Sequence, residues 1–246
     1  MFKIQPMKFN LILLFVSLTF FSFTTKNSSV KETSPAEFST MTSLDKMLFI
    51  EEVYNNLETN KNALPKLKSF EKGLLGFYAL KEQGKIKKNI LTIVDYSLPS
   101  YQKRLWVIDL NENKILYNTL VAHGVNSGKV YASKFSNKAD SNKSSLGFFA
   151  TGETYVGSHG LSLKLDGLER GINHKARMRD IVVHGAPYVS NAYIKSNKNK
   201  ILGRSQGCPA LPQKLSKNII KTIKNKSCLF IYAPDNLYAK KSKLIV

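Results

Sequence analysis

The sequence D-I-V-V-H-G-A-P-Y-V-S at positions 180–190 is followed, after a polar segment, by L-G-R-S-Q-G-C-P-A-L at positions 202–211. Residues 181–183 form a short β-branched run typical of a buried strand, and His184 follows where that strand is expected to end. Cys208 stands between a glycine and a proline, so the backbone is expected to turn sharply on both sides of the sulfur. The two segments predict an imidazole at a strand end and an exposed thiol in a turn.

A thiol and an imidazole can form a nucleophile and its base. A free Cys with a pKa of about 8.5 is mostly protonated at neutral pH, and the thiolate is the reactive form. His184 is the candidate base, Arg204 a candidate nearby cation, and Gly207 leaves room for backbone N–H groups to hold an oxyanion. This pattern predicts acyl transfer through a thioester. The alternative is a buried apolar Cys208 and a structural His184, since spacing alone does not bring the two together.

These residues resemble the YkuD-like L,D-transpeptidase catalytic domain family, whose members cross-link bacterial peptidoglycan. The family pattern is a strand ending in His, then a loop and Ser/Thr-x-Gly-Cys, which matches His184, Ser205, Gly207 and Cys208. The resemblance is closest to the murein L,D-transpeptidase subgroup with Pro-Ala after the Cys, and it covers roughly residues 90–235.

The sequence departs from the family pattern at two places. Gln206 stands where many members have a His before the Gly-Cys pair. Because the family pattern assigns the base role to the strand-end His, which is His184 here, this departure leaves the implied mechanism unchanged. Pro209 and Ala210 stand where many members have a hydrophobic residue followed by Arg or Asn. The second departure leaves the details of substrate recognition open.

The resemblance implies that Cys208 attacks the amide between the L-centre of a diamino acid and the terminal D-residue of a peptide stem. His184 would take the thiol proton and return it to the leaving amine. It also implies that the Gly185 carbonyl orients the imidazole and that donors near Gly207 hold the oxyanion. The candidate substrate-binding residues are Arg204, Ser205, Tyr188 and His159. The expected partners are peptidoglycan stem peptides, and no metal or cofactor is implied.

Three other functions were weighed. An L,D-carboxypeptidase would use the same residues with water in place of the acceptor amine, and a non-catalytic cell-wall-binding protein would have a degenerate site. A zinc peptidase would draw its ligands from His123, His159, His184, Asp166 and Cys208. No two of these residues have the spacing of a helical or knuckle zinc site, so a metal site is not predicted.

Residues 1–24 have the pattern of a secretory signal peptide. Lys3 and Lys8 precede an apolar run of 13 residues (23 − 11 + 1) from Leu11 to Phe23, whereas a spanning helix needs about 20. No A-x-A triplet defines a cleavage site, so membrane association through an uncleaved segment is the alternative. We therefore expect an exported protein, periplasmic or associated with the cell envelope.

The net charge of +20 favours anionic partners. Because we expect export, the most suitable anionic partner is an acidic polymer of the cell wall. The sequence contains no recognisable nucleic-acid-binding module, which argues against nucleic acid as the partner. The alternative is that dispersed lysines serve solubility. Export would also permit a disulfide between Cys208 and Cys228, but the apolar run around Cys228 predicts a buried free thiol. The sequence does not indicate an oligomeric state.

The periodicity divides the chain into five parts. After the signal we expect a linker (25–42), a helical appendage (43–88), an L,D-transpeptidase-like catalytic domain (89–235) and a basic tail (236–246). Within the catalytic domain, period-two segments predict strands at 91–96, 104–110, 114–123, 146–151, 162–165, 181–184 and 228–232, with a helix at 214–224. The predicted fold class is mainly β, a β-sandwich or barrel-like domain with a small N-terminal helical appendage.

Overall fold

The computed structural model describes residues 1–2 and 33–245. The predicted signal segment, apart from its first two residues, and the first part of the predicted linker lie outside the described residues. Among the described residues, no helix combines the length and apolar character needed to span a bilayer.

Eight strands form one sheet in the order β3-β2-β1-β8-β4-β5-β6-β7. Their bounds are β1 Ile90–Asp95, β2 Leu105–Asp109, β3 Lys114–Thr119, β4 Gly147–Gly157, β5 Gly160–Gly167, β6 Val182–Ala186, β7 Ala210–Pro212 and β8 Cys228–Tyr232. Most neighbours are antiparallel, but β1 pairs with β8 and β6 with β7 in parallel. The strand cores are rich in β-branched and aromatic residues, which suit a pleated, buried surface.

The two edge strands of this sheet are brought together by the chain that follows β3. The Ala122 N–H donates to the Ala210 carbonyl at 2.9 Å, and Gly124 forms a bridge with Ser205. The sheet is therefore curled into a nearly closed barrel, which protects the backbone groups of both edges. The mainly β, barrel-like fold class is confirmed.

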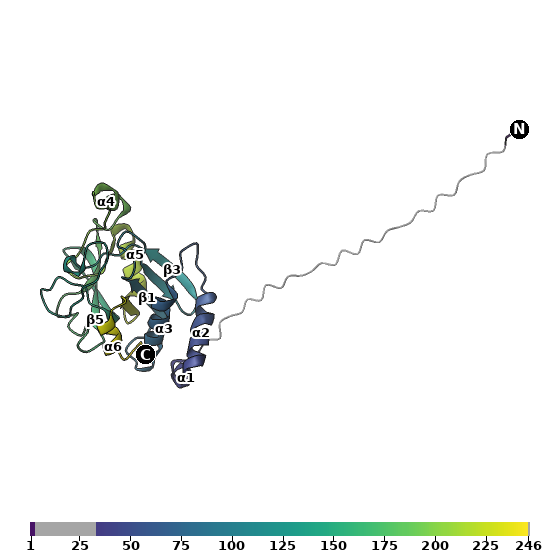
Figure 1. Cartoon of the computed structure of the whole chain (residues 1–246), viewed down its shortest axis with the longest axis horizontal. Helices are drawn as coiled ribbons and strands as arrows, with labels where there is room; N and C mark the ends of the chain where they lie inside the picture. Colours follow the sequence, from purple (N-terminus) through teal and green to yellow (C-terminus); the bar gives the residue numbers. More distant parts are fainter. Residues whose placement is uncertain (3–32, 246) are drawn as a thin grey trace.

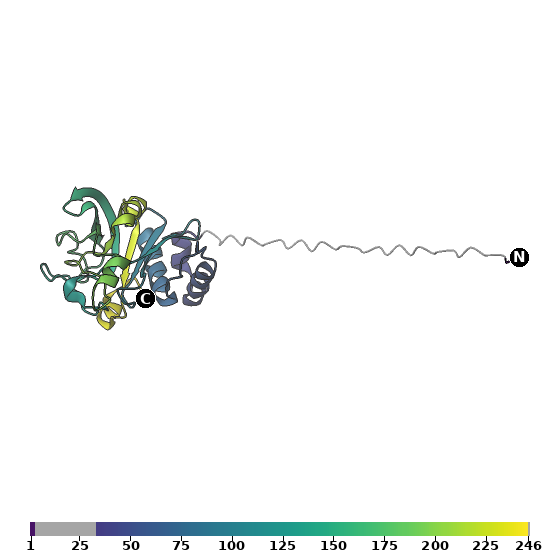
Figure 2. The same cartoon turned by 90° about the horizontal axis from the view of Figure 1, so that it is seen from above.

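The helices are α1 Pro35–Thr40, α2 Ser43–Asn55, α3 Leu67–Glu82, α4 Asn191–Ser196, α5 Gln213–Ile223 and α6 Asn236–Lys241, with a 3-10 turn at Val125–Ser127. Figure 1 shows α1 to α3 grouped beside the N-terminal strands, and Figure 2 shows the same grouping from above. The α3 helix lies directly on the sheet, since a Cβ at Gly76 would be 2.0 Å from the ring of Phe148. The predicted helical pattern of 43–88 thus corresponds to α2 and α3.

The structure contains elements that the sequence pattern did not predict. The predicted linker contains α1, whose Ser34 cap accepts a hydrogen bond from Glu37, and the predicted basic tail contains α6, which Asp235 caps in the same way. The strand β6 continues past His184 to Ala186, because Gly185 and Ala186 pair with β7. The short elements β7 and α4 were not predicted, since three to six residues are too few to show a period.

Candidate active site

The Cys208 turn is built around the side chain of Ser205. Its hydroxyl donates to the Cys208 carbonyl at 2.6 Å and accepts from the Gly207 N–H at 3.0 Å. Gly207 has a φ of +126°, a left-handed value, and a Cβ there would lie 3.0 Å from the Lys143 carbonyl oxygen. Glycine is therefore required at this position, and the serine fixes the path of the backbone into the cysteine.

The thiol of Cys208 lies against the start of β6. Its sulfur accepts a weak hydrogen bond from the Val182 N–H at 3.4 Å and donates one to the Asp180 carbonyl at 3.5 Å. Cys208 is partly buried. Burial raises the pKa of the thiol, while the Val182 N–H and the Arg179 cation oppose that rise. The nucleophile candidate thus has an anion-stabilising donor and a cation beside it.

His184 lies in the middle of β6 and is 2 % exposed. Its Nδ1 lies 2.9 Å from the Gly185 carbonyl oxygen. Because a carbonyl only accepts, Nδ1 carries the proton of the neutral ring, and Nε2 has the lone pair. The ring stacks on that of His159, from the turn between β4 and β5, at a centroid distance of 4.3 Å. Burial, chiefly, and the charge of His159 lower the pKa of His184.

His184 lies in β6, and Cys208 lies in the turn before β7, the strand that pairs with β6. His184 pairs with Ala210 in parallel register, and Cys208 precedes Ala210 by two residues. Both residues belong to the described part of the chain, and no hydrogen bond joins them in this structure. The fold thus brings the predicted pair to neighbouring segments of the chain without a hydrogen bond between them.

Arg204 contacts the backbone of the segment that follows β3. Its guanidinium donates to the carbonyls of Val125 and Gly128, at 3.4 and 3.3 Å. The cation that acts on the thiol is Arg179 instead. Arg179 donates four hydrogen bonds, none to a carboxylate, to Ser136, Ser141, Lys143 and Ser145.

Only a weak signal in the sequence marks Arg179 and Asp180. Both residues stand directly before the strand that carries His184, and functional residues often lie at the end of a strand. Only the fold shows that the Cys208 turn contacts this segment.

Tyr188, another candidate, packs against Gly203. Burial together with the Cys208 thiolate raises the pKa of its phenol to about 12.

A cavity of about 240 Å³ lies at the start of β6. Residues that line it include Tyr155, Lys164, Leu165, Arg177, Asp180 and Val182. The last two also contact the sulfur of Cys208. None of the polar residues of this cavity was among the sequence-based candidates, because they come from β4, β5 and the loop before β6.

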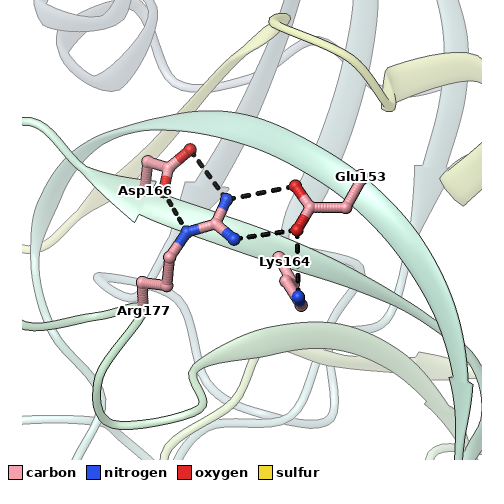
Figure 3. A network of polar contacts seen from close by, with 4 residues as sticks. All are labelled: Glu153, Lys164, Asp166 and Arg177. Carbon is pink, nitrogen blue, oxygen red and sulfur yellow. Dashed lines mark hydrogen bonds and ion pairs between the residues drawn. The ribbon is translucent and has the colours of Figure 1, made fainter.

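One wall of the cavity is held by a network of ion pairs (Figure 3). Arg177 donates to both oxygens of Asp166 and to both oxygens of Glu153. Lys164 adds a contact to Glu153 at 2.9 Å. The network lowers the pKa of Glu153, mainly through the Arg177 hydrogen bonds, and it ties the loop before β6 to the hairpin of β4 and β5.

His123 is buried behind the Cys208 turn. Its Nδ1 lies 2.7 Å from Nη2 of the buried Arg104, and its Nε2 lies 3.1 Å from the Gly128 carbonyl oxygen. Arg104 can only donate, so Nε2 carries the proton and the ring is neutral. Burial, followed by the charge of Arg104, lowers the pKa of His123 to about 4. The His123 carbonyl accepts from the Ser205 N–H at 3.0 Å, so this network supports the turn.

The structure also bears on the metal and disulfide alternatives. Over residues 33–245, no three His, Cys, Asp or Glu side chains are grouped closely enough to hold a metal ion. His174, the remaining histidine, is exposed. Cys208 and Cys228 are both free thiols, and Cys228 is fully buried in β8.

A family model described as L,D-transpeptidase catalytic domain matches residues 61–232, and a search of curated proteins gives no match. Similar solved structures include an L,D-transpeptidase from Mycobacterium smegmatis, with 12% identity, a TM-score of 0.37 and coverage of 59% of each chain. Another, from Xylanimonas cellulosilytica, has 11% identity and a TM-score of 0.34, covering 75% of this chain and 92% of that one. The chain thus spans under two thirds of the length of the first of these.

Proposed function

The chain belongs to the L,D-transpeptidase catalytic domain family, and from that premise we propose that it is a peptidoglycan L,D-transpeptidase acting through a thioester on Cys208. The observation that supports this most directly is the partly buried thiol itself, held in the Ser205 turn against the start of β6 and beside Arg179. A structural cysteine would need none of these neighbours; Cys228 lies instead within the fully buried strand β8.

In the first half-reaction the sulfur attacks the carbonyl carbon of the donor stem's penultimate residue. The thiol proton passes to Nε2 of His184, whose lone pair the Gly185 hydrogen bond leaves available. A C–S bond forms, the C–N bond breaks, and the imidazolium returns the proton to the leaving amine of the terminal D-residue. Because the imidazole and the thiol are not bonded in this structure, the contact would form when substrate binds.

The oxyanion donor is the N–H of Cys208 in this proposal. The Gly207 N–H is already bonded to Ser205, whereas the Cys208 N–H has no partner among residues 33–245. An N–H donor aimed at the developing oxyanion is typically worth about 2.7–4 kcal/mol in the transition state. Gly207 then contributes through its backbone conformation rather than through its own N–H.

In the second half-reaction an acceptor amine resolves the thioester. Its nitrogen lone pair forms a C–N bond to the carbonyl carbon, and the C–S electron pair returns to sulfur. The proton that the nitrogen loses passes through His184 to the thiolate, which restores the thiol. In the alternative L,D-carboxypeptidase, water attacks in place of the amine and the product is a trimmed stem.

Arg204, Ser205, Tyr188 and His159 remain proposed contributors to stem binding. Ser205 and His159 have contacts that support this, since one shapes the Cys208 turn and the other covers His184. We also propose that the protein is exported to the periplasm or cell envelope, with a helical appendage before the catalytic domain. Association with a membrane through the N-terminal segment belongs to the same proposal.

The test is intact mass spectrometry of the purified protein incubated with tetrapeptide stems, with the peptide products analysed in parallel. We expect a covalent adduct that disappears in Cys208→Ala and persists in Cys228→Ala, the matched control at the other cysteine. Cross-linked dimers identify the transpeptidase, and trimmed stems alone identify the carboxypeptidase. If the protein is folded, has a free thiol and still forms neither adduct nor product, the transpeptidase and carboxypeptidase functions are both contradicted. The alternative that remains is a non-catalytic cell-wall-binding protein.

A further inference from the structure

The carbonyl of Gly207 and the N–H of Cys208 belong to one peptide unit. This N–H is the proposed oxyanion donor, and it has no partner in the part of the chain that the structure describes. The described chain contains no cis peptide bond, and in a planar trans unit the carbonyl and the N–H point in opposite directions. A contact that fixes the direction of the Gly207 carbonyl therefore also fixes the direction of the oxyanion donor.

Ser144 makes that contact. Its hydroxyl donates to the Gly207 carbonyl oxygen at 3.2 Å and accepts a hydrogen bond from the Gly124 N–H at 3.0 Å. The Ser144 N–H in turn donates to the hydroxyl of Ser127 at 2.8 Å. Because both the backbone and the side chain of Ser144 are bonded, the fold sets the direction of its hydroxyl.

The Ser144 hydroxyl lies in a closely packed place. Ser144 is fully buried, and a Cβ at Gly124 would lie 3.0 Å from the Cα of Gly207. The buried phenol of Tyr96 also adjoins Ser144, and it donates to the Ala122 carbonyl oxygen. Water therefore does not easily replace the serine as the donor to the Gly207 carbonyl.

Ser144 differs in its role from Ser205, the other serine that bonds to this turn. Ser205 contacts the Gly207 N–H and the Cys208 carbonyl. These two groups belong to the peptide units before and after the one that holds the oxyanion donor. Ser144 contacts the unit between them. Two serines from different segments thus fix three consecutive peptide units, and Ser144 fixes the one whose N–H is free.

We propose that Ser144 is a positioning residue that orients the Cys208 N–H towards the oxyanion formed when the thiol is acylated. The proposal rests on the acylation of Cys208 proposed above. As the C–S bond forms, the carbonyl electron pair of the substrate moves to its oxygen, to which the N–H donates. The pair then returns and the bond to the leaving group breaks. Ser144 neither gains nor loses a proton, and a preorganised donor lowers the barrier because it needs no reorientation.

The test compares two reactions of the same thiol in Ser144→Ala. The ester para-nitrophenyl acetate acylates the sulfur through a tetrahedral oxyanion and releases para-nitrophenolate. Iodoacetamide alkylates the sulfur by displacement of iodide, and no oxyanion forms. Both reactions need the thiolate, so the ratio of acylation to alkylation rates is insensitive to a change in the pKa of the thiol. The rates in Cys208→Ala are subtracted as the background from other nucleophiles.

We expect the acylation rate of Ser144→Ala to fall about ten-fold to hundred-fold, because a misdirected donor loses most of its effect on the transition state, while the alkylation rate changes less than about two-fold. The matched control is Ser69→Ala, which also removes a fully buried hydroxyl, bonded to the Lys66 carbonyl, and should keep both rates. An unchanged ratio of the two rates in Ser144→Ala overturns the proposal, whether both rates fall together or neither changes.

A second variant covers the case in which Ser144→Ala does not fold. Ser127→Ala removes the acceptor of the Ser144 N–H and so frees the backbone that directs the Ser144 hydroxyl. Urea unfolding shows whether each variant is folded under the conditions of the assay. A lower ratio of acylation to alkylation in the folded Ser127→Ala protein supports the proposal, and a wild-type ratio overturns it.

Stem peptides separate this proposal from the proposed function. With stems, Ser144→Ala should lower kcat and leave KM within about two-fold, because the oxyanion exists only in the transition state. A wild type that is acylated by the ester at Cys208 but not by stems contradicts the proposed function alone. A wild type that iodoacetamide alkylates at Cys208 but the ester does not acylate overturns the proposed role of Ser144.

Discussion

The Ser205 hydroxyl donates a hydrogen bond to the Cys208 carbonyl oxygen at 2.6 Å. The same oxygen atom of Ser205 accepts the Gly207 N–H, so one side chain satisfies two backbone groups of the turn that carries the thiol. Ser205 is 6% exposed, and water does not replace these bonds easily.

Removing this hydroxyl should loosen the turn more than it unfolds the protein. We predict that Ser205→Ala lowers the rate of Cys208 acylation at least about ten-fold and the free energy of unfolding by about 1–3 kcal/mol, because two buried backbone groups lose their partner. Ser205→Thr keeps the hydroxyl and should retain most of the rate. Acylation measured by intact mass, beside urea unfolding, tests this; a wild-type rate in the alanine variant would disprove it.

The stacked histidines should set the acid limb of the pH profile. The pKa of His184 is lowered by burial and by the charge of His159, and the proposed base must be neutral. Removal of that charge lets His184 bind a proton more easily, so His159→Gln should move the acid limb of kcat/KM to higher pH. His174→Gln, at the exposed histidine, is the control and should leave the limb in place. A shift to lower pH would contradict the assignment.

The buried His123 should make the fold sensitive to acid. Its pKa is about 4 in the folded chain and about 6.5 when unfolded, so only the unfolded state takes up a proton as pH falls between these values. Stability present above pH 6.5 is therefore lost towards pH 4, by about 3 kcal/mol in full. Burial raises the pKa of Glu169 in the folded chain, so the stability that this carboxyl contributes decreases as pH rises, opposite to the effect of His123.

The measurement is urea unfolding at pH 7.5 and 4.5 for the wild type and His123→Gln. Because Glu169 titrates in both proteins, its contribution cancels in the comparison. We expect the drop in unfolding free energy between the two pH values to be smaller in the variant by about 2–3 kcal/mol. Identical drops would show that His123 is protonated in the folded state.

The contact of α3 with the sheet can be tested at two glycines. A Cβ at Gly76 would lie 2.0 Å from the buried Phe148 ring, whereas one at Gly73 would lie 3.3 Å from Phe230. Both alanines gain about the same helix propensity, roughly 0.5–1 kcal/mol. We predict that Gly76→Ala destabilises by about 1–3 kcal/mol from overpacking, and that Gly73→Ala is milder. Equal unfolding free energies would argue against this packing.

The sequence alone determined the features that depend on neighbours along the chain. Alternating apolar residues predicted seven of the strands, and three-to-four periodicity predicted α2, α3 and most of α5, because these patterns follow from the geometry of a strand and a helix. Glycine and proline around Cys208 likewise predicted a turn, since both act on the backbone where they stand.

Only the tertiary structure decided what surrounds the thiol. Arg179 and not Arg204 is the cation near Cys208, and the cavity comes from residues of β4, β5 and the loop before β6. The stacking of His159 on His184 joins a hairpin turn to a strand 25 positions away (184 − 159). Such contacts are set by strand order and register across the sheet, which local sequence patterns do not encode. The residue types determine the chemistry of the site, and the closing of the barrel determines its geometry.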